Sequence, residues 1–143
     1  MIGDDARKFL HGLVTADILD LAPGMARFCA LLTPQGKIIA DFLVTEAPRV
    51  EGGGFFLDIP RALATVLVEK LNLYKLRAKV LIEDLSEILG VLAVWDGVGA
   101  TKQAKQGLGY VDPRLSTLGL RIMIAPHRGA EAASELAAAL VGA

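Results

Sequence analysis

The stretch "LLTPQGKIIADFLV", residues 31–44, contains two apolar runs separated by a short polar turn. Pro34 suits the first corner of a β-turn, and Gly36 tolerates the positive φ that closes a three-residue hairpin loop. The stretch therefore predicts a β-hairpin. Because both of its strands are apolar, at least one face of the hairpin belongs against a core.

Alternation along the second strand assigns its side chains to two faces. The face expected against the core is wholly apolar and carries Ile38, Ala40, Phe42 and Val44. The opposite face is apolar except for Asp41 and, near the strand end, Thr45. Ile39 and Leu43 are expected beside the acid on that face. Asp41 is thus either a solvated surface acid or a carboxylate in an apolar surround that suits a ligand slot, and both interpretations remain open.

Two segments next to the hairpin have helical periodicity. The first, residues 3–14, opens with acids that suit a helix N-terminus. The second covers residues 61–74, follows a short predicted strand at 55–59, and begins after Pro60. Its apolar stripe is formed by Leu63, Val66, Leu67, Leu71 and Tyr74.

The rest of the chain predicts three more strands and a last helix. Residues 78–84 alternate, and the continuous apolar run 88–95 favours a strand buried on both faces. Residues 118–126 alternate again, and 129–143 form an alanine-rich helix. The order indicates an α+β fold, mostly antiparallel sheet with packed helices, with a possible seam in the glycine-rich segment 97–109.

Composition excludes several classes of function. The chain has 143 residues, 53% of them hydrophobic, and a net charge of -1, so it has no basic field to attract nucleic acid or a membrane. Its single cysteine, Cys29, excludes a cluster held by several thiolates and is expected to be buried and inert. His11 and His127 lack metal-ligand spacing. No signal peptide or membrane-spanning run is evident, which indicates a cytoplasmic protein.

Four stretches together resemble the YgfZ-like family, relatives of the glycine-cleavage T-protein. They are "GDDARKFLHGLVTADI", "LLTPQGKIIADFLV", "LNLYKLRAKVLIEDLSE" and "GYVDPRLSTLGLRIMI". They follow the family's order of G-D-D-A…F-L-x-G-L-x-T-x-D, then L-x-x-Y-x-x-R-x-K-V, then D-P-R…L-G-x-R. The resemblance covers nearly the whole chain and corresponds to the N-terminal portion of such proteins.

The resemblance implies a folate-binding fold with ferredoxin-like elements around a tetrahydrofolate cavity. It implies an accessory role in iron–sulfur cluster assembly or repair, with folate and the assembly machinery as partners and an indirect effect on tRNA modification. Two alternatives are an aminomethyltransferase of the glycine cleavage system and a non-catalytic interaction domain. In a eukaryote, the compartment would be the mitochondrial matrix.

The chain departs from the family pattern in two places. The K-G-C-Y-x-G-Q-E motif of the later half is missing, so we expect residues 1–143 to be an incomplete part that self-associates through uncovered apolar surface. T-proteins carry adjacent acids at the hairpin position, whereas this chain has Ala40 and Asp41. The loss of one acid argues against aminomethyl transfer and leaves folate binding open.

The resemblance implies folate contacts at five positions: Asp41, Tyr74, Arg77, Arg114 and Arg121. Tyr74, Arg77 and Lys79 either place cations against a helix C-terminus or contact the glutamate tail of folate. Asp112 and Arg114 flank Pro113 and either lock a turn or present an arginine to a ligand carboxylate, as Arg121 also could.

Overall fold

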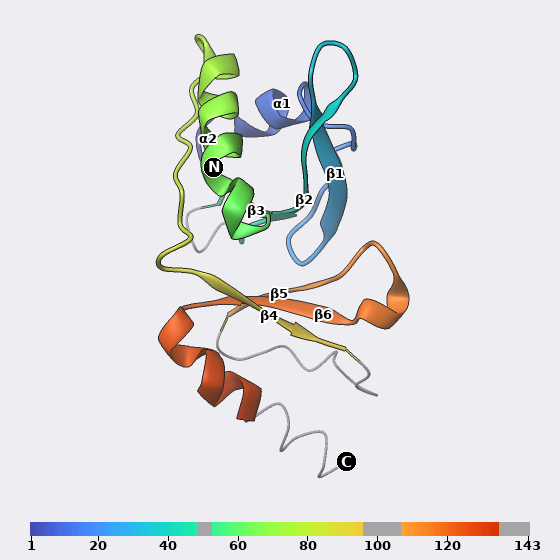
Figure 1. Ribbon diagram of the computed structural model, residues 1–143, viewed down its shortest axis with the longest axis vertical. Helices are drawn as coiled ribbons and strands as arrows, with labels where there is room; N and C mark the ends of the chain where they lie inside the picture. Colours follow the sequence, from blue (N-terminus) through green and yellow to red (C-terminus); the bar gives the residue numbers. More distant parts are fainter. Residues whose placement is uncertain (49–52, 96–106, 135–143) are drawn as a thin grey trace. The chain divides into compact units, whose positions relative to one another are not determined.

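A computed structural model describes residues 1–48, 53–95 and 107–134, and the chain divides into two compact units, Met1–Asp84 and Leu85–Ala143 (Figure 1). The architecture is α+β, with one three-stranded antiparallel sheet in each unit. This confirms the predicted fold class. Most of the predicted seam at 97–109 lies outside the described residues.

The first sheet contains the predicted hairpin. Its strands are β1 (Ala26–Leu32), β2 (Ile38–Glu46) and β3 (Phe55–Asp58), in the order β1-β2-β3. The Thr33 amide donates to the Lys37 carbonyl (2.8 Å), and the Gly36 amide donates to the Thr33 carbonyl (2.9 Å). Gly36 has φ 81°, so the three-residue loop closes as predicted.

A register shift near the loop changes which isoleucine faces the core. Leu31 pairs with Ala40, but Leu32 pairs with Ile38, so Ile39 is an extra residue in β2. Ile39 packs against the core, whereas Ile38 is 68% exposed. The predicted faces are therefore wrong at these two positions, because a β-bulge interrupts the period of two. The alternation holds from Ala40 onward.

Both helices of the first unit cover the same face of this sheet. They are α1 (Ala6–His11) and α2 (Arg61–Lys75), and Figure 1 shows α2 alongside the hairpin. Their core cluster includes Leu10, Leu67, Leu71, Leu31, Phe42 and Val44. Val66 was expected in the buried stripe but is 40% exposed, because it lies on the helix face opposite Ala64 and Leu71.

Residues 78–84 do not form the predicted strand. Leu81 makes one bridge, to Ile2, with both backbone hydrogen bonds formed (3.0 and 2.7 Å). The alternation still places Val80 in the core. The ladder stops after one bridge because the opposing segment turns away at Gly3, which has φ 129°.

The second unit contains β4 (Gly90–Val94), β5 (Leu108–Val111) and β6 (Leu120–Ile124), in the order β4-β6-β5. Two short 3-10 helices, η2 (Ser116–Leu118) and η3 (Pro126–Arg128), flank β6, and residues 129–134 are helical. The rest of the predicted last helix lies outside the described residues. The alternation of β6 is confirmed by its buried side chains, Leu120, Ile122 and Ile124.

Three expectations for the second unit are corrected. The run 88–95 is not buried on both faces, since Ile88 is 62% and Trp95 66% exposed, and β4 occupies one end of the described sheet. Leu118 belongs to η2 and is 37% exposed, so it does not join the β6 face. The β5 strand was missed because it is only four residues long and contains Gly109.

Within the described ranges, no helix is both long and apolar enough to span a membrane.

Candidate functional site

The outer face of the first sheet carries the candidate site, which we call the Asp41 face and define by four side chains: Phe28, Ala30, Asp41 and Leu43. Ala30 pairs with Asp41 and Phe28 pairs with Leu43, so all four project from the same side of the hairpin. Asp41 is exposed, Phe28 is 47% exposed, and Leu43 is buried. The arrangement presents one carboxylate next to an aromatic ring and aliphatic side chains.

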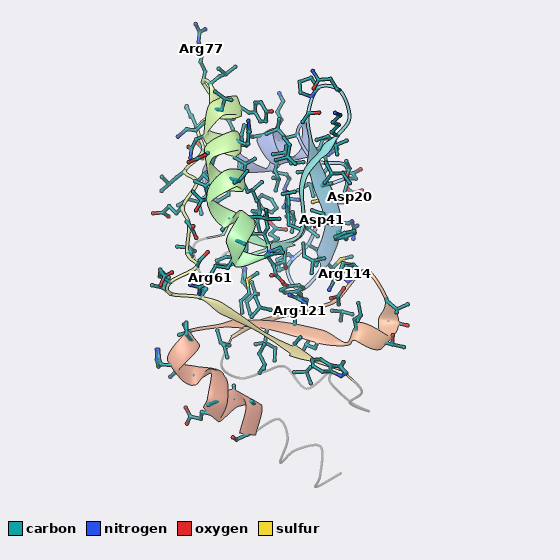
Figure 2. All side chains as sticks on the ribbon, viewed as in Figure 1. Asp20, Asp41, Arg61, Arg77, Arg114 and Arg121 are labelled. Carbon is teal, nitrogen blue, oxygen red and sulfur yellow. The ribbon has the colours of Figure 1, made fainter. Side chains whose placement is uncertain are left out.

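The side chain of Asp41 is exposed on the outer side of the hairpin. Among the described residues, none donates a hydrogen bond to its carboxylate or forms an ion pair with it. Figure 2 labels Asp41 on the hairpin of the first unit. An exposed acid without a structural partner can accept hydrogen bonds from an amine or an N–H of a ligand.

Thr15 positions the strand residue opposite Asp41, a role that the sequence analysis missed. The Ala30 amide donates to Thr15 Oγ1 (2.9 Å), and the Thr15 amide donates to the Ala30 carbonyl (3.1 Å). Thr15 belongs to the T-x-D part of the motif that follows α1. This motif therefore supports the outer edge of β1 next to the Asp41 face.

Arg7 holds the segment that follows α1 against the sheet. Its Nη1 donates to the carbonyls of Ile18 (2.7 Å) and Leu21 (3.0 Å), and its Nη2 lies 2.6 Å from Glu46 Oε1. The guanidinium also lies 5.0 Å from the centre of the Phe55 ring. Arg7 is thus fully used by the fold. The only signal in the sequence was a cation in a helix whose other face is apolar.

Tyr74 and Arg77 do not gather around Asp41. Tyr74 is partly buried and packs against the core from the last turn of α2. Arg77 is exposed and projects beyond the end of α2, away from Asp41 (Figure 2). Of the site residues predicted in this unit, Tyr74 and Arg77 therefore do not join Asp41 on the Asp41 face.

Lys79 belongs to a backbone junction with the N-terminal motif. Its amide donates to Asp5 Oδ2 (2.7 Å), and its carbonyl accepts from the Asp5 amide (3.4 Å). A Cβ on Gly3 would lie 2.1 Å from the Lys79 carbonyl oxygen, so only glycine fits there. The G-D-D-A and R-x-K-V stretches therefore contact each other, and their spacing serves the fold.

Asp112, Arg114 and Arg121 are together in the second unit. The Asp112 side chain is 1% exposed and accepts from Arg114 Nε (2.9 Å) and Nη2 (2.6 Å), while Arg121 Nη1 lies 3.7 Å away. The hydrogen bond from Arg114 holds the pKa of the Asp112 carboxyl below its usual value, although burial opposes this. This is the turn lock that the D-P-R sequence left as one of two interpretations.

Neither metal chemistry nor thiol chemistry is supported by the described residues. They contain no group of three or more His, Cys, Asp or Glu side chains that could hold a metal ion. Cys29 is buried, and burial raises the pKa of its thiol to about 12, so it is protonated and inert at neutral pH. The expected character of Cys29 is confirmed.

No protein-family model matches the chain. Curated relatives do match it. The mitochondrial iron–sulfur cluster assembly factor IBA57 homolog of Mycosarcoma maydis is 30% identical over 129 residues, which cover 83% of this chain and 32% of the relative. The corresponding protein of Pyricularia oryzae is 30% identical over 126 residues, covering 85% of this chain and 32% of the relative.

A bacterial relative also matches the chain. The tRNA-modifying protein YgfZ of Edwardsiella ictaluri is 30% identical over 115 residues, which cover 79% of this chain and 31% of the relative. The chain thus spans about a third of the length of the curated relatives it matches. Over the segment that it shares with these proteins, the chain is related to the YgfZ-like family.

Proposed function

We propose that the chain is part of a tetrahydrofolate-binding accessory protein that acts in iron–sulfur cluster assembly or repair. The names of the relatives support the assembly role, and an indirect effect on tRNA modification would follow from it. The single observation that carries the folate proposal is the exposed carboxylate of Asp41 beside Phe28 and Leu43. In this proposal, the chain contributes to the folate-binding fold of T-proteins, and tetrahydrofolate binds at the Asp41 face.

The Asp41 face suits the chemistry of a reduced pterin. A pterin is a flat ring with several N–H groups, and a carboxylate accepts hydrogen bonds from such groups while apolar side chains cover the ring. Phe28, which is 47% exposed, supplies apolar contact on the same side of the sheet as Asp41, while its pairing partner Leu43 is buried. Thr15 restrains Ala30, so the strand opposite Asp41 is held in place before a ligand binds.

The geometry argues for an accessory protein rather than an aminomethyltransferase. Ala40 is 3% exposed and packs in the core, so the position next to Asp41 does not contribute to the outer face. One carboxylate therefore remains at this position of the hairpin. Aminomethyl transfer requires proton transfers during attack on the carrier, and we propose that this chain binds folate without carrying out that reaction.

The arginines and Tyr74 remain predicted folate contacts of lower rank. Arg77 is free to reach a glutamate tail only if folate extends toward the end of α2. Arg114 is already bonded to Asp112, so a ligand carboxylate would have to compete with that pair. We therefore assign the principal contact to Asp41.

The proposed partners are tetrahydrofolate and proteins of the iron–sulfur assembly machinery. The compartment would be the cytoplasm, or the mitochondrial matrix in a eukaryote, as the fungal relatives suggest. Self-association of residues 1–143 also remains a prediction. Light scattering would test it, since a chain that stays monomeric at high concentration would contradict it.

Isothermal titration with tetrahydrofolate tests the function. We expect saturable binding by the full polypeptide that carries residues 1–143, and no formation of methylene-tetrahydrofolate when an aminomethyl-lipoyl carrier is added. Product formation would favour the aminomethyltransferase instead. Absence of folate binding would leave an interaction domain.

A further inference from the structure

The outer side of α2 exposes apolar side chains that the core does not use. Val66 is 40% and Leu73 65% exposed, and their spacing of seven residues places them on one side of the helix, two turns apart. Leu76 caps the helix and is 89% exposed. We call these three residues the α2 outer stripe.

Leu76 also has an unfavourable backbone conformation. Its φ is 43°, and it is the single described residue other than glycine with a positive φ. A leucine with a positive φ has a strained backbone, and in this conformation the apolar side chain of Leu76 is exposed to solvent. Neither the strained backbone of Leu76 nor the exposure of its side chain is offset by packing within the described chain. This points to a contact outside the described chain.

The charge near the stripe is positive. Lys70 lies on one edge of the stripe and Glu69 on the other, and Arg77 follows the helix end. Lys70 flanks the stripe between Val66 and Leu73, while Arg77 projects beyond the helix end (Figure 2). A second copy of this helix in antiparallel packing would bring Lys70 near its own equivalent, which disfavours self-association through this face.

We propose that the α2 outer stripe is a docking surface for an amphipathic helix of a partner protein, with carboxylates along one edge of its apolar side. The partner's apolar residues would cover Val66, Leu73 and Leu76, and its acids would lie next to Lys70 and Arg77. A helix laid along α2 fits two exposed residues two turns apart better than a membrane surface does, since a membrane would select a continuous apolar face. The surface is separate from the Asp41 face and does not depend on folate.

A labelled peptide of about 18 residues, roughly five helical turns, provides the probe. It carries leucines at helical spacing of three and four and glutamates on one flank, and fluorescence anisotropy measures its affinity for the 143-residue chain. A second peptide has lysines in place of the glutamates. We expect the lysine peptide to bind at least about tenfold more weakly, with the difference shrinking at high salt.

Two variants locate the contact. Leu73→Ser should weaken binding of the glutamate peptide by about tenfold, because it removes an apolar side chain from the interface. Leu76→Gly should weaken it similarly while leaving the melting temperature unchanged or higher, since glycine accepts φ 43° without strain. The matched control is Ile88→Ser, which alters an apolar side chain of similar exposure (62%) and should bind the peptide like the unmodified chain.

Several results would overturn the proposal. Equal affinity for the two peptides, or affinity that Leu73→Ser and Leu76→Gly leave unchanged, would remove the docking surface. Binding to vesicles of phosphatidylserine and phosphatidylcholine at a ratio of about one to two, lost in Leu76→Gly, would assign the stripe to a membrane. A dimer in sedimentation equilibrium that Leu73→Ser dissociates would assign it to a second copy.

Discussion

Asp112 and Asp41 are both aspartates at a sheet, but the fold uses them differently. Asp112 is buried and bonded to Arg114, with Arg121 nearby. Asp41 is exposed, and no described residue bonds to its carboxylate. An acid whose hydrogen bonds are all made within the chain is there for the fold, whereas one left open among apolar side chains is available for a ligand.

The same contrast divides the motifs that carry the family resemblance. The Gly3–Asp5 segment and Lys79 form a junction, and in the D-P-R turn the buried Asp112 carboxylate pairs with the partly exposed Arg114. In both motifs, polar groups are bonded within the fold. The hairpin, by comparison, presents Asp41 outward, and none of the residues that the structure describes bonds to its carboxylate, so we propose that the functional content of the resemblance lies there.

The largest expected effect is at the junction. Gly3→Ala should destabilise the first unit by about 3 kcal/mol or more, because the added Cβ meets the Lys79 carbonyl oxygen and φ is positive. Gly36→Ala is the matched control, since φ is also positive there but no atom lies within 4 Å. It should cost about 1 kcal/mol. Urea denaturation followed by circular dichroism measures both, and equal losses would show that the junction is not tightly packed.

Asp112→Asn should have the next largest effect and act on the second unit. It removes the charge from a buried pair and should cost about 2 kcal/mol, reduced by the partial exposure of Arg114. The single tryptophan, Trp95, lies in this unit and can report its unfolding by fluorescence. Asp41→Asn should leave the Trp95 transition in place, and a comparable shift would erase the distinction between the two acids.

The pH dependence of the second unit should follow Asp112. Because its folded-state pKa is lowered, the carboxylate stabilises the fold above its unfolded pKa of about 4. That stability is lost as the pH falls through the lower, folded-state pKa. Thermal unfolding monitored at Trp95 should therefore shift downward in acid, and the shift should be smaller in Asp112→Asn. An identical acid shift in both proteins would assign it to other groups.

The sequence predicted the hairpin, both helices of the first unit and the β6 strand because each has a periodic apolar pattern or a turn with specific residues. Prediction failed where a single residue interrupts the apolar periodicity. The bulge at Ile39 leaves no signal in a sequence of two consecutive isoleucines. It reverses the sheet faces that were predicted for Ile38 and Ile39. The β5 strand is too short to show a period.

The candidate site was predicted in part. Alternation correctly placed Asp41 opposite the core face, and the D-P-R spacing correctly suggested an Asp–Arg contact. The role of Thr15 was missed because it depends on a contact with Ala30, fifteen residues away. Long-range backbone contacts of this kind, including that between Asp5 and Lys79, leave no local pattern in the sequence.

The most direct test of the account is the effect of Asp41→Asn on tetrahydrofolate affinity, measured by isothermal titration alongside the melting temperature. Asparagine keeps the shape of the side chain and removes its charge. We expect a Kd that rises about tenfold with a melting temperature within about 1 °C of the unmodified protein. An unchanged Kd would contradict the assignment and make Asp41 a surface acid.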